Sequence, residues 1–233
     1  MMLRRAMMAG ASGGVTDPYW ANVVSLLHLD GADGSTSTTD QKGKSWTFFG
    51  SGSALDTGHA AFGPSSLLLS GGGNSRVEAA STSTDFDLSG NYCAEGWIRP
   101  ASIGNNAIIT IGTSNSERIT IGVSSTLGLY LYTASGGSGA VRISSGAGTV
   151  STGVWRHFAA TKDSGVWWLF LHGALSGTSS TTVYPSGSLK AYIGAGAVSD
   201  SLFHGHIDEG RFTKSVARYT SAFTAPTAPF PNS

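Results

Sequence analysis

Short apolar runs alternate with clusters of Gly, Ser, Thr and Asn along most of this chain. Strands spaced about 10–15 residues apart with turn residues between them are typical of a β-sandwich or barrel. No run keeps a helical period over three turns, and the one weak helix candidate is 214–223. The sequence therefore predicts an all-β protein. The predicted strands are 23–29, 46–49, 66–69, 92–98, 107–111, 118–123, 127–133, 140–143, 155–161, 166–172, 189–193 and 202–212.

The amino-acid composition excludes several further classes of fold and of binding partner. Gly, Ser and Thr make up 91 of the 233 residues, which excludes helical bundles and coiled coils. The 10 Phe, 7 Tyr and 6 Trp supply enough apolar surface to disfavour disorder. Fourteen basic and fourteen acidic side chains cancel, so no global field would attract nucleic acid or an anionic membrane. The single cysteine, Cys93, excludes an intrachain disulfide and is expected to be a small buried residue.

The chain divides into three predicted parts. Residues 1–17 carry two Arg, four Met and a Gly-rich joint, and are predicted to be a flexible arm that becomes ordered only on docking to a partner. Their apolar run is too short for a secretion signal or a spanning helix, which predicts synthesis in the cytoplasm without membrane insertion. Residues 18–213 form the predicted sandwich. Residues 214–233 end in a Pro-rich strap that cannot join a central strand.

Two strands show a clear alternation of side chains. In 127–132 the leucines share one face and Tyr130 and Tyr132 the other, and in 166–172 Trp168 and Phe170 lie opposite Trp167 and two leucines. If both strands belong to one sheet, these four rings form an aromatic shelf that would stack sugar rings. The alternative is that protein covers the shelf, because soluble monomers generally avoid such bare apolar patches.

Six segments stand out, in this order: LDG at 29–31, FGPSSLLLSG at 62–71, CAEGWIRP at 93–100, GVWRHFAATKD at 153–163, WLFLHG at 168–173 and FHGHIDEGRF at 203–212. Together they resemble the laminin-G-like domain of the concanavalin A-like lectin/glucanase superfamily. The resemblance implies a two-sheet antiparallel jelly-roll sandwich. Two departures, His172 at a turn and Gly210 in the last strand, weaken the pattern locally.

The flanks at 17–31 and 216–226 resemble versions of this domain encoded by tailed bacteriophages. That resemblance implies a virion protein on the capsid or tail surface. Its expected partners are other virion proteins, host-surface glycans and further copies of itself.

The resemblance also implies a structural Ca²⁺ held by Asp30, Asp208 and backbone oxygens of 71–74. The alternative is that Asp30 caps a turn and Asp208 accepts backbone donors. The spacing of His204, His206 and Asp208 also suits a metal, although we favour a plain solvent-facing strand. His157 is expected to be a packed, hydrogen-bonded strand residue, as in the family.

The carboxylates argue against an enzyme. Retaining glycosidases need two carboxyl groups about 5–5.5 Å apart, whereas no two of the four Glu lie within four residues of each other. Asp208 and Glu209 are adjacent, so on a regular strand they would point to opposite faces. We therefore predict a non-enzymatic virion structural or decoration protein with a glycan-binding jelly roll. The alternatives are a polysaccharide depolymerase and a purely architectural capsid or tail component.

Overall fold

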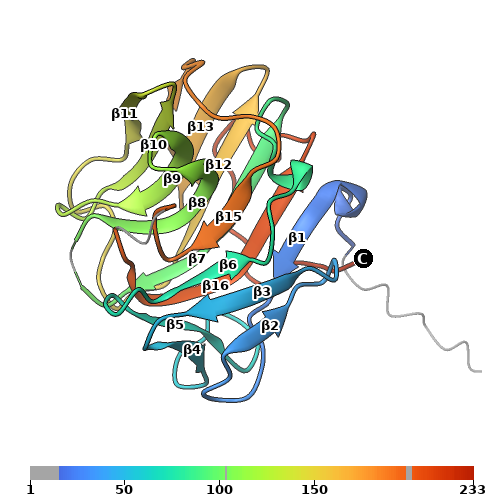
Figure 1. The fold of residues 1–233 in the computed structure, drawn as a ribbon, viewed down its shortest axis with the longest axis vertical. Helices are drawn as coiled ribbons and strands as arrows, with labels where there is room; N and C mark the ends of the chain where they lie inside the picture. The colour runs from blue at the N-terminus through green and yellow to red at the C-terminus, as the bar shows by residue number, and fades with distance from the viewer. Residues whose placement is uncertain (1–15, 103, 198–200) are drawn as a thin grey trace, which may run out of the picture.

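A computed structural model describes residues 16–102, 104–197 and 201–233. In these residues two eight-stranded sheets, A and B, pack face to face as a sandwich (Figure 1). The paired strands run antiparallel, which confirms the predicted all-β, jelly-roll-like fold. None of the described helices is long and apolar enough to cross a membrane. The two short 3-10 helices are η1 (Trp20–Asn22) and η2 (Thr84–Phe86).

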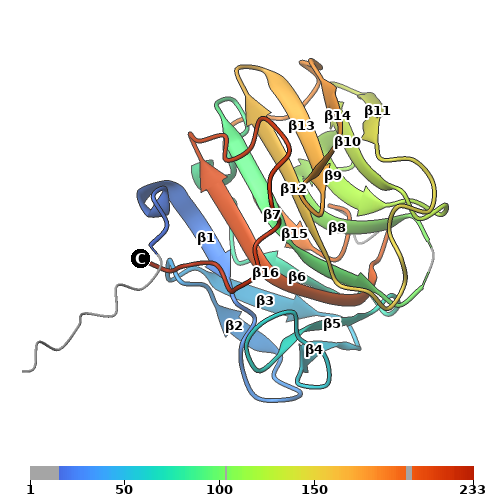
Figure 2. The same ribbon diagram turned by 180° about the vertical axis from the view of Figure 1, so that it is seen from behind.

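Sheet A forms the layer that faces the viewer in Figure 2. Its strand order is β14-β13-β12-β7-β16-β5-β4, and β1 also pairs with β16. The strands are β14 (Ala174–Ser179), β13 (Val166–Leu171), β12 (Arg156–Asp163), β7 (Tyr92–Pro100), β16 (His204–Lys214), β5 (Ser66–Ser70), β4 (Ser53–Asp56) and β1 (Val23–Leu27).

Sheet B has the order β11-β10-β9-β8-β15-β6-β3-β2. The strands are β11 (Ser138–Ser144), β10 (Leu129–Ser135), β9 (Glu117–Val123), β8 (Asn106–Ser114), β15 (Lys190–Ile193), β6 (Arg76–Ala79), β3 (Ser45–Phe49) and β2 (Ser37–Thr39).

The apolar runs locate the strands well. Each of the twelve predicted runs overlaps a strand, whereas β2, β4, β6 and β14 were not predicted. Three of these four lie at sheet edges, where β2 and β14 bury too little to need an apolar pattern. The helix candidate at 214–223 is wrong, because after Lys214 this segment leaves the sheet in bends without a helical turn.

The core lies between the inner faces of the two sheets. Leu129 and Leu131 of β10 are fully buried there, while Tyr130 points outward and is half-buried. On β13, Trp167 and Leu169 enter the same core. The alternation read from the sequence therefore assigned the inner faces of both strands correctly, because the side-chain period of a strand is two.

A bulge in β16 allows this strand to pair with two different strands, β5 and β1, along the same edge. Its first part pairs with β5 and its last part with β1, and the register to β7 shifts between Asp208 and Arg211. Glu209 takes a left-handed conformation there, with φ 53°. The expectation that Asp208 and Glu209 point to opposite faces is therefore wrong: both contact segments that cover the outer face, because the bulge breaks the alternation.

A buried ion network attaches both ends of the described chain to the outer face of sheet A. The Glu95 carboxylate on β7 is fully buried and accepts hydrogen bonds from Arg211 (Nε–Oε1, 3.0 Å) and the Tyr219 hydroxyl (3.0 Å). Asp17 pairs with Arg211 at 3.1 Å and with Arg218 at 2.6 Å. Asp17 thus belongs to the folded domain and not to the predicted arm. Residues 1–15, where the docking arm was predicted, lie outside the described residues.

The network sets the protonation of Glu95. Burial alone would raise the pKa of this carboxyl, but the Arg211 charge and the hydrogen bond with His157 outweigh it and lower the pKa from 4.5 to about 2. A carboxyl with a lowered folded-state pKa stabilises the fold above its unfolded pKa, near 4.5, and loses that contribution as the pH falls toward 2. The difference corresponds to about 3 kcal/mol.

We therefore expect Glu95→Gln to lower the free energy of unfolding at pH 7 by about 3–5 kcal/mol, because two buried guanidinium groups lose their counter-charge. Urea unfolding between pH 7 and pH 2 measures this. The gap between wild type and variant should close as the pH falls below about 4.5. Glu117→Gln, at the surface end of β9, is the control. A gap that stays constant down to pH 2 would contradict the assigned role of Glu95.

Candidate functional site

A hollow of about 350 Å³ lies on the outer face of sheet B, over β8 to β11. It combines two aromatic side chains with hydroxyl, amide and guanidinium groups. Such a mixture of apolar faces and directed polar groups is typical of small-ligand sites. Its described lining consists of Asn105, Arg118, Thr120, Ser124, Thr126, Tyr130, Tyr132, Val141, Ser144, Gly196 and Ser201.

The two tyrosine rings lie over glycines. A Cβ added at Gly122 would come within 2.5 Å of the Tyr130 Cζ and Oη atoms. A Cβ added at Gly139 would lie 2.1 Å from the Tyr132 Oη atom. Because these glycines lack a side chain, the rings can lie down across the sheet and cover it, an arrangement known from aromatic residues beside strand glycines.

Polar groups surround the two rings. The Arg118 guanidinium lies 5.4 Å from the centre of the Tyr132 ring, in a cation–π arrangement. Ser124 and Thr126 exchange a hydrogen bond of 3.0 Å between their hydroxyls. The Asn105 Oδ1 accepts a hydrogen bond from the backbone N–H of Ser125. This bond fixes the orientation of the side chain and of its amide NH₂ group. The hollow therefore offers flat apolar surface together with donors and acceptors.

The other half of the predicted shelf lies elsewhere. Trp168 and Phe170 are on β13 of sheet A, whereas Tyr130 and Tyr132 are on β10 of sheet B. The four rings therefore do not form one surface. Sequence alternation fixes which face a residue takes but not which sheet its strand joins.

Phe170 is covered by the chain's own C-terminal segment, which crosses the outer face of sheet A (Figure 2). Its ring centre lies 5.3 Å from that of Phe223 and 6.2 Å from that of Tyr219, and Phe170 has no exposed surface. Trp168 is half-buried on the same strand. Phe170, which the sequence predicted to be a ligand-binding residue, is thus packed under the strap of its own chain.

Asp208 sits beneath the loop between β4 and β5. Its Oδ2 accepts the backbone N–H groups of Ala61 (2.8 Å) and Phe62 (3.1 Å), and Oδ1 accepts that of Glu209. Burial, opposed by these three bonds, raises the pKa of Asp208 to about 7. Asp208 thus accepts backbone donors, which was the alternative to calcium.

The complete predicted calcium ligand set does not come together. Residue 207 pairs with Leu67 near the start of β5, while residues 71–74 follow the far end of that strand, where His204 pairs with Ser70. The loop oxygens are therefore at the opposite end of β5 from Asp208. Asp30 is exposed, and a Ca²⁺ bound by Asp30 and Asp208 alone stays a prediction.

The three residues His204, His206 and Asp208 do share a face of β16, but it is not the expected solvent face. His206 and Asp208 are buried under the β4–β5 loop, and His204 bonds to Ser102 through Nδ1 at 3.0 Å. His206 is instead hydrogen-bonded to Asp56.

Two expectations about buried residues are confirmed. His157 is fully buried and bonds to Glu95 through Nε2 at 3.2 Å. Cys93 is fully buried, and burial raises the pKa of its thiol to about 12, which makes it unreactive.

Sequence reasoning missed several lining residues, including Asn105, Arg118 and Val141. Two signals were readable: Gly122 interrupts the apolar run 118–123, and Gly139 directly precedes the run 140–143. A glycine within a strand often marks a close approach, here by an aromatic ring. Which glycine lies under which ring depends on strand pairing and could not be read from the chain.

The sandwich and its surface hollow define a lectin-like jelly-roll domain. Residues 71–218 match the family model described as the concanavalin A-like lectin/glucanases superfamily, of laminin G type. Since this is more than half of the chain, the protein belongs to that superfamily. No curated protein matches the chain.

Solved structures share the fold. Domain 4 of AbnA, a GH43 extracellular arabinanase from Geobacillus stearothermophilus in complex with arabinotriose, has 17% identity and a TM-score of 0.64, covering 82% of this chain and 92% of that one. The binding domain of botulinum neurotoxin DC in complex with rat synaptotagmin II has 14% identity and a TM-score of 0.62, covering 84% and 48%. A Trypanosoma rangeli sialidase mutant has 10% identity and a TM-score of 0.59, covering 83% and 31%. At these identities the likeness shows the fold alone.

The two outward-facing aromatic residues of β13, Phe170 and Trp168, should behave differently on truncation. We expect Phe170→Ala to cost about 3–5 kcal/mol of unfolding free energy, because it opens a cavity under the strap. The C-terminal segment of this variant should also become accessible to protease. Trp168→Ala, on the same strand face and only partly buried, is the matched comparison and should cost clearly less. Equal, small losses in urea unfolding would show that the strap does not pack on Phe170.

Proposed function

We propose that this protein is a non-enzymatic glycan-binding module and that it binds sugar in the hollow on sheet B. The observation that carries the proposal is the pair Tyr130 and Tyr132. Their rings lie across the sheet over two glycines, and Arg118 and several hydroxyl groups line the hollow around them. The apolar face of a sugar ring stacks on such an aromatic surface, while its hydroxyls take the surrounding donors and acceptors.

Related structures support a carbohydrate ligand. The arabinanase domain was solved with arabinotriose. Another protein of similar structure is botulinum neurotoxin type C, whose cell entry is dependent upon interaction with two ganglioside molecules. These ligands belong to those proteins. For this chain they favour an oligosaccharide as the first class to test.

The competing function is a polysaccharide depolymerase. The adjacent carboxyls Asp208 and Glu209 are both buried on sheet A, and each accepts backbone N–H groups of its own chain. Glu95 is enclosed by its ion network on the same sheet. Burial raises the pKa of Asp208 to about 7, a value that would suit a general acid, but all three carboxyl groups are buried and already accept hydrogen bonds from the chain itself. None of them is placed to reach a substrate, which supports binding without hydrolysis.

The proposal also includes a location on the surface of a bacteriophage virion, as a capsid or tail component. Its support is the resemblance of the two flanks, 17–31 and 216–226, to phage-encoded versions of the domain. In the fold these flanks meet: Asp17 pairs with Arg218, and its backbone N–H donates to the carbonyl of Ser233 at 2.8 Å. The two flanks thus lie together at sheet A, where a neighbouring virion protein or a second copy would contact both.

The binding site can be tested with three variants on a panel of purified oligosaccharides. Tyr132→Ala should weaken binding about fivefold or more, since stacking contributes roughly 1 kcal/mol beyond area. Gly139→Ala should weaken it too, because the added Cβ displaces the Tyr132 hydroxyl while the ring remains. Phe49→Ala, an exposed aromatic side chain on β3 of the same sheet, is the control and should bind normally.

The outcomes separate the candidate functions. Trp168→Ala, measured on the same panel, distinguishes the two sheets: loss of binding in this variant alone would move the site to sheet A. Release of shortened sugars would establish a depolymerase, and no affinity for any glycan would favour the purely architectural alternative.

The location has its own measurement. A density map of the intact virion should contain this sandwich on the outer surface, with a neighbour in contact with residues 17–31 and 216–226. If purified virions do not contain the protein, the structural role is contradicted.

A further inference from the structure

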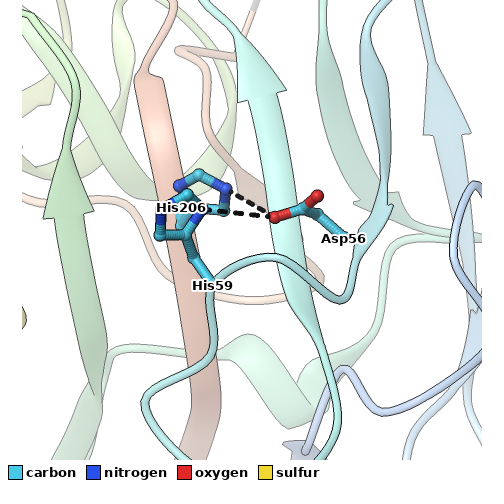
Figure 3. A group of neighbouring side chains, drawn as sticks. All are labelled: Asp56, His59 and His206. Carbon is cyan, nitrogen blue, oxygen red and sulfur yellow. Dashed lines mark hydrogen bonds and ion pairs between the residues drawn. The ribbon is translucent and has the colours of Figure 1, made fainter.

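Asp56, His59 and His206 come together at the edge of sheet A (Figure 3). Asp56 is the last residue of β4, and His59 follows it in the loop toward β5. His206 reaches the same point from β16, about 150 positions later in the chain. Both imidazoles point at the same carboxylate oxygen, Asp56 Oδ2.

The spacing of the three groups fits a small cation. His206 Nε2 lies 3.0 Å and His59 Nδ1 lies 3.6 Å from Asp56 Oδ2. One ligand atom from each residue lies within 4.8 Å of the others. A tetrahedral Zn²⁺ with bonds of about 2.0–2.1 Å holds its ligand atoms roughly 3.3 Å apart. Small side-chain rotations would therefore bring all three groups to bonding distance.

The surrounding structure orients the ligands. The Gly58 N–H bond fixes the Asp56 carboxylate, and the Ser66 hydroxyl donates to the His59 carbonyl at 2.5 Å and so fixes the loop. The Trp155 ring packs edge-on against the His206 ring, with centroids 6.3 Å apart. Positioning of this kind raises the affinity of a metal site, because less order has to be imposed on binding.

We propose that Asp56, His59 and His206 form a binding site for a divalent transition-metal ion of the Zn²⁺ class. Two imidazoles and one carboxylate suit Zn²⁺, Co²⁺ or Ni²⁺, whereas Ca²⁺ and Mg²⁺ prefer oxygen ligands alone. His59 is 47% exposed, so the fourth position opens to solvent and takes water or a group from another molecule. The site is separate from the sheet B hollow and does not depend on the glycan proposal.

Thermal unfolding and calorimetric titration of the whole chain with ZnCl₂ test the site. Zn²⁺ at a hundred times its Kd should shift the folding equilibrium about a hundredfold toward the folded state and raise Tm. We expect His59→Ala, which removes an exposed ligand, and Asp56→Asn to weaken Zn²⁺ at least tenfold. His204→Ala is the matched control, since it lies on the same strand outside the cluster and bonds to Ser102.

Co²⁺ gives an independent readout, because a tetrahedral site with nitrogen ligands produces visible absorption that is lost in His59→Ala. Three results would overturn the proposal: a Tm unchanged at Zn²⁺ on the order of 0.1 mM, equal Zn²⁺ affinity in wild type and His59→Ala, or a Ca²⁺ response as large as that to Zn²⁺.

Discussion

The charge on Glu95 organises the outer face of sheet A. A carboxylate at the centre of a sheet, with no exposed surface, is stable only if cations and hydrogen-bond donors surround it. Arg211 comes from the neighbouring strand, His157 from the strand on the other side and Tyr219 from the C-terminal segment. Arg218 also pairs with Glu95, and it pairs in turn with Asp17. Both ends of the described chain are thereby attached to the sheet.

The two sheet faces differ as a consequence. On sheet A the strap covers Phe170 and the β4–β5 loop covers His206 and Asp208, with a hollow of about 460 Å³ left between them beside Trp97 and Trp155. The face of sheet B keeps a hollow over β8 to β11. Of two chemically similar aromatic strands, the fold thus uses one to anchor its own C-terminal segment and leaves the other available for a ligand.

The bulge in β16 has a comparable effect. By shifting the register between Asp208 and Arg211, it puts Asp208 under the loop and Arg211 beside Glu95, so that one strand supplies both the loop anchor and the network. Glu209, in the bulge, accepts the backbone N–H of Phe230 near the chain end. A regular strand would have directed either Asp208 or both Glu209 and Arg211 into the apolar core, where an unpaired charge is costly.

The sequence alone determined the all-β class, the places of the twelve apolar strands and the inner faces of β10 and β13, because burial enforces a period of two along each strand. It also indicated that His157 and Cys93 are structural. Only the tertiary structure decided which distant residues come together. It placed Tyr130 and Trp168 in different sheets and put Asp208 and the loop 71–74 at opposite ends of β5. It also brought His206 next to Asp56 and His59. These outcomes depend on which strands pair and in which register, and pairing between distant segments is set by the packing of the whole sandwich, not by any local pattern.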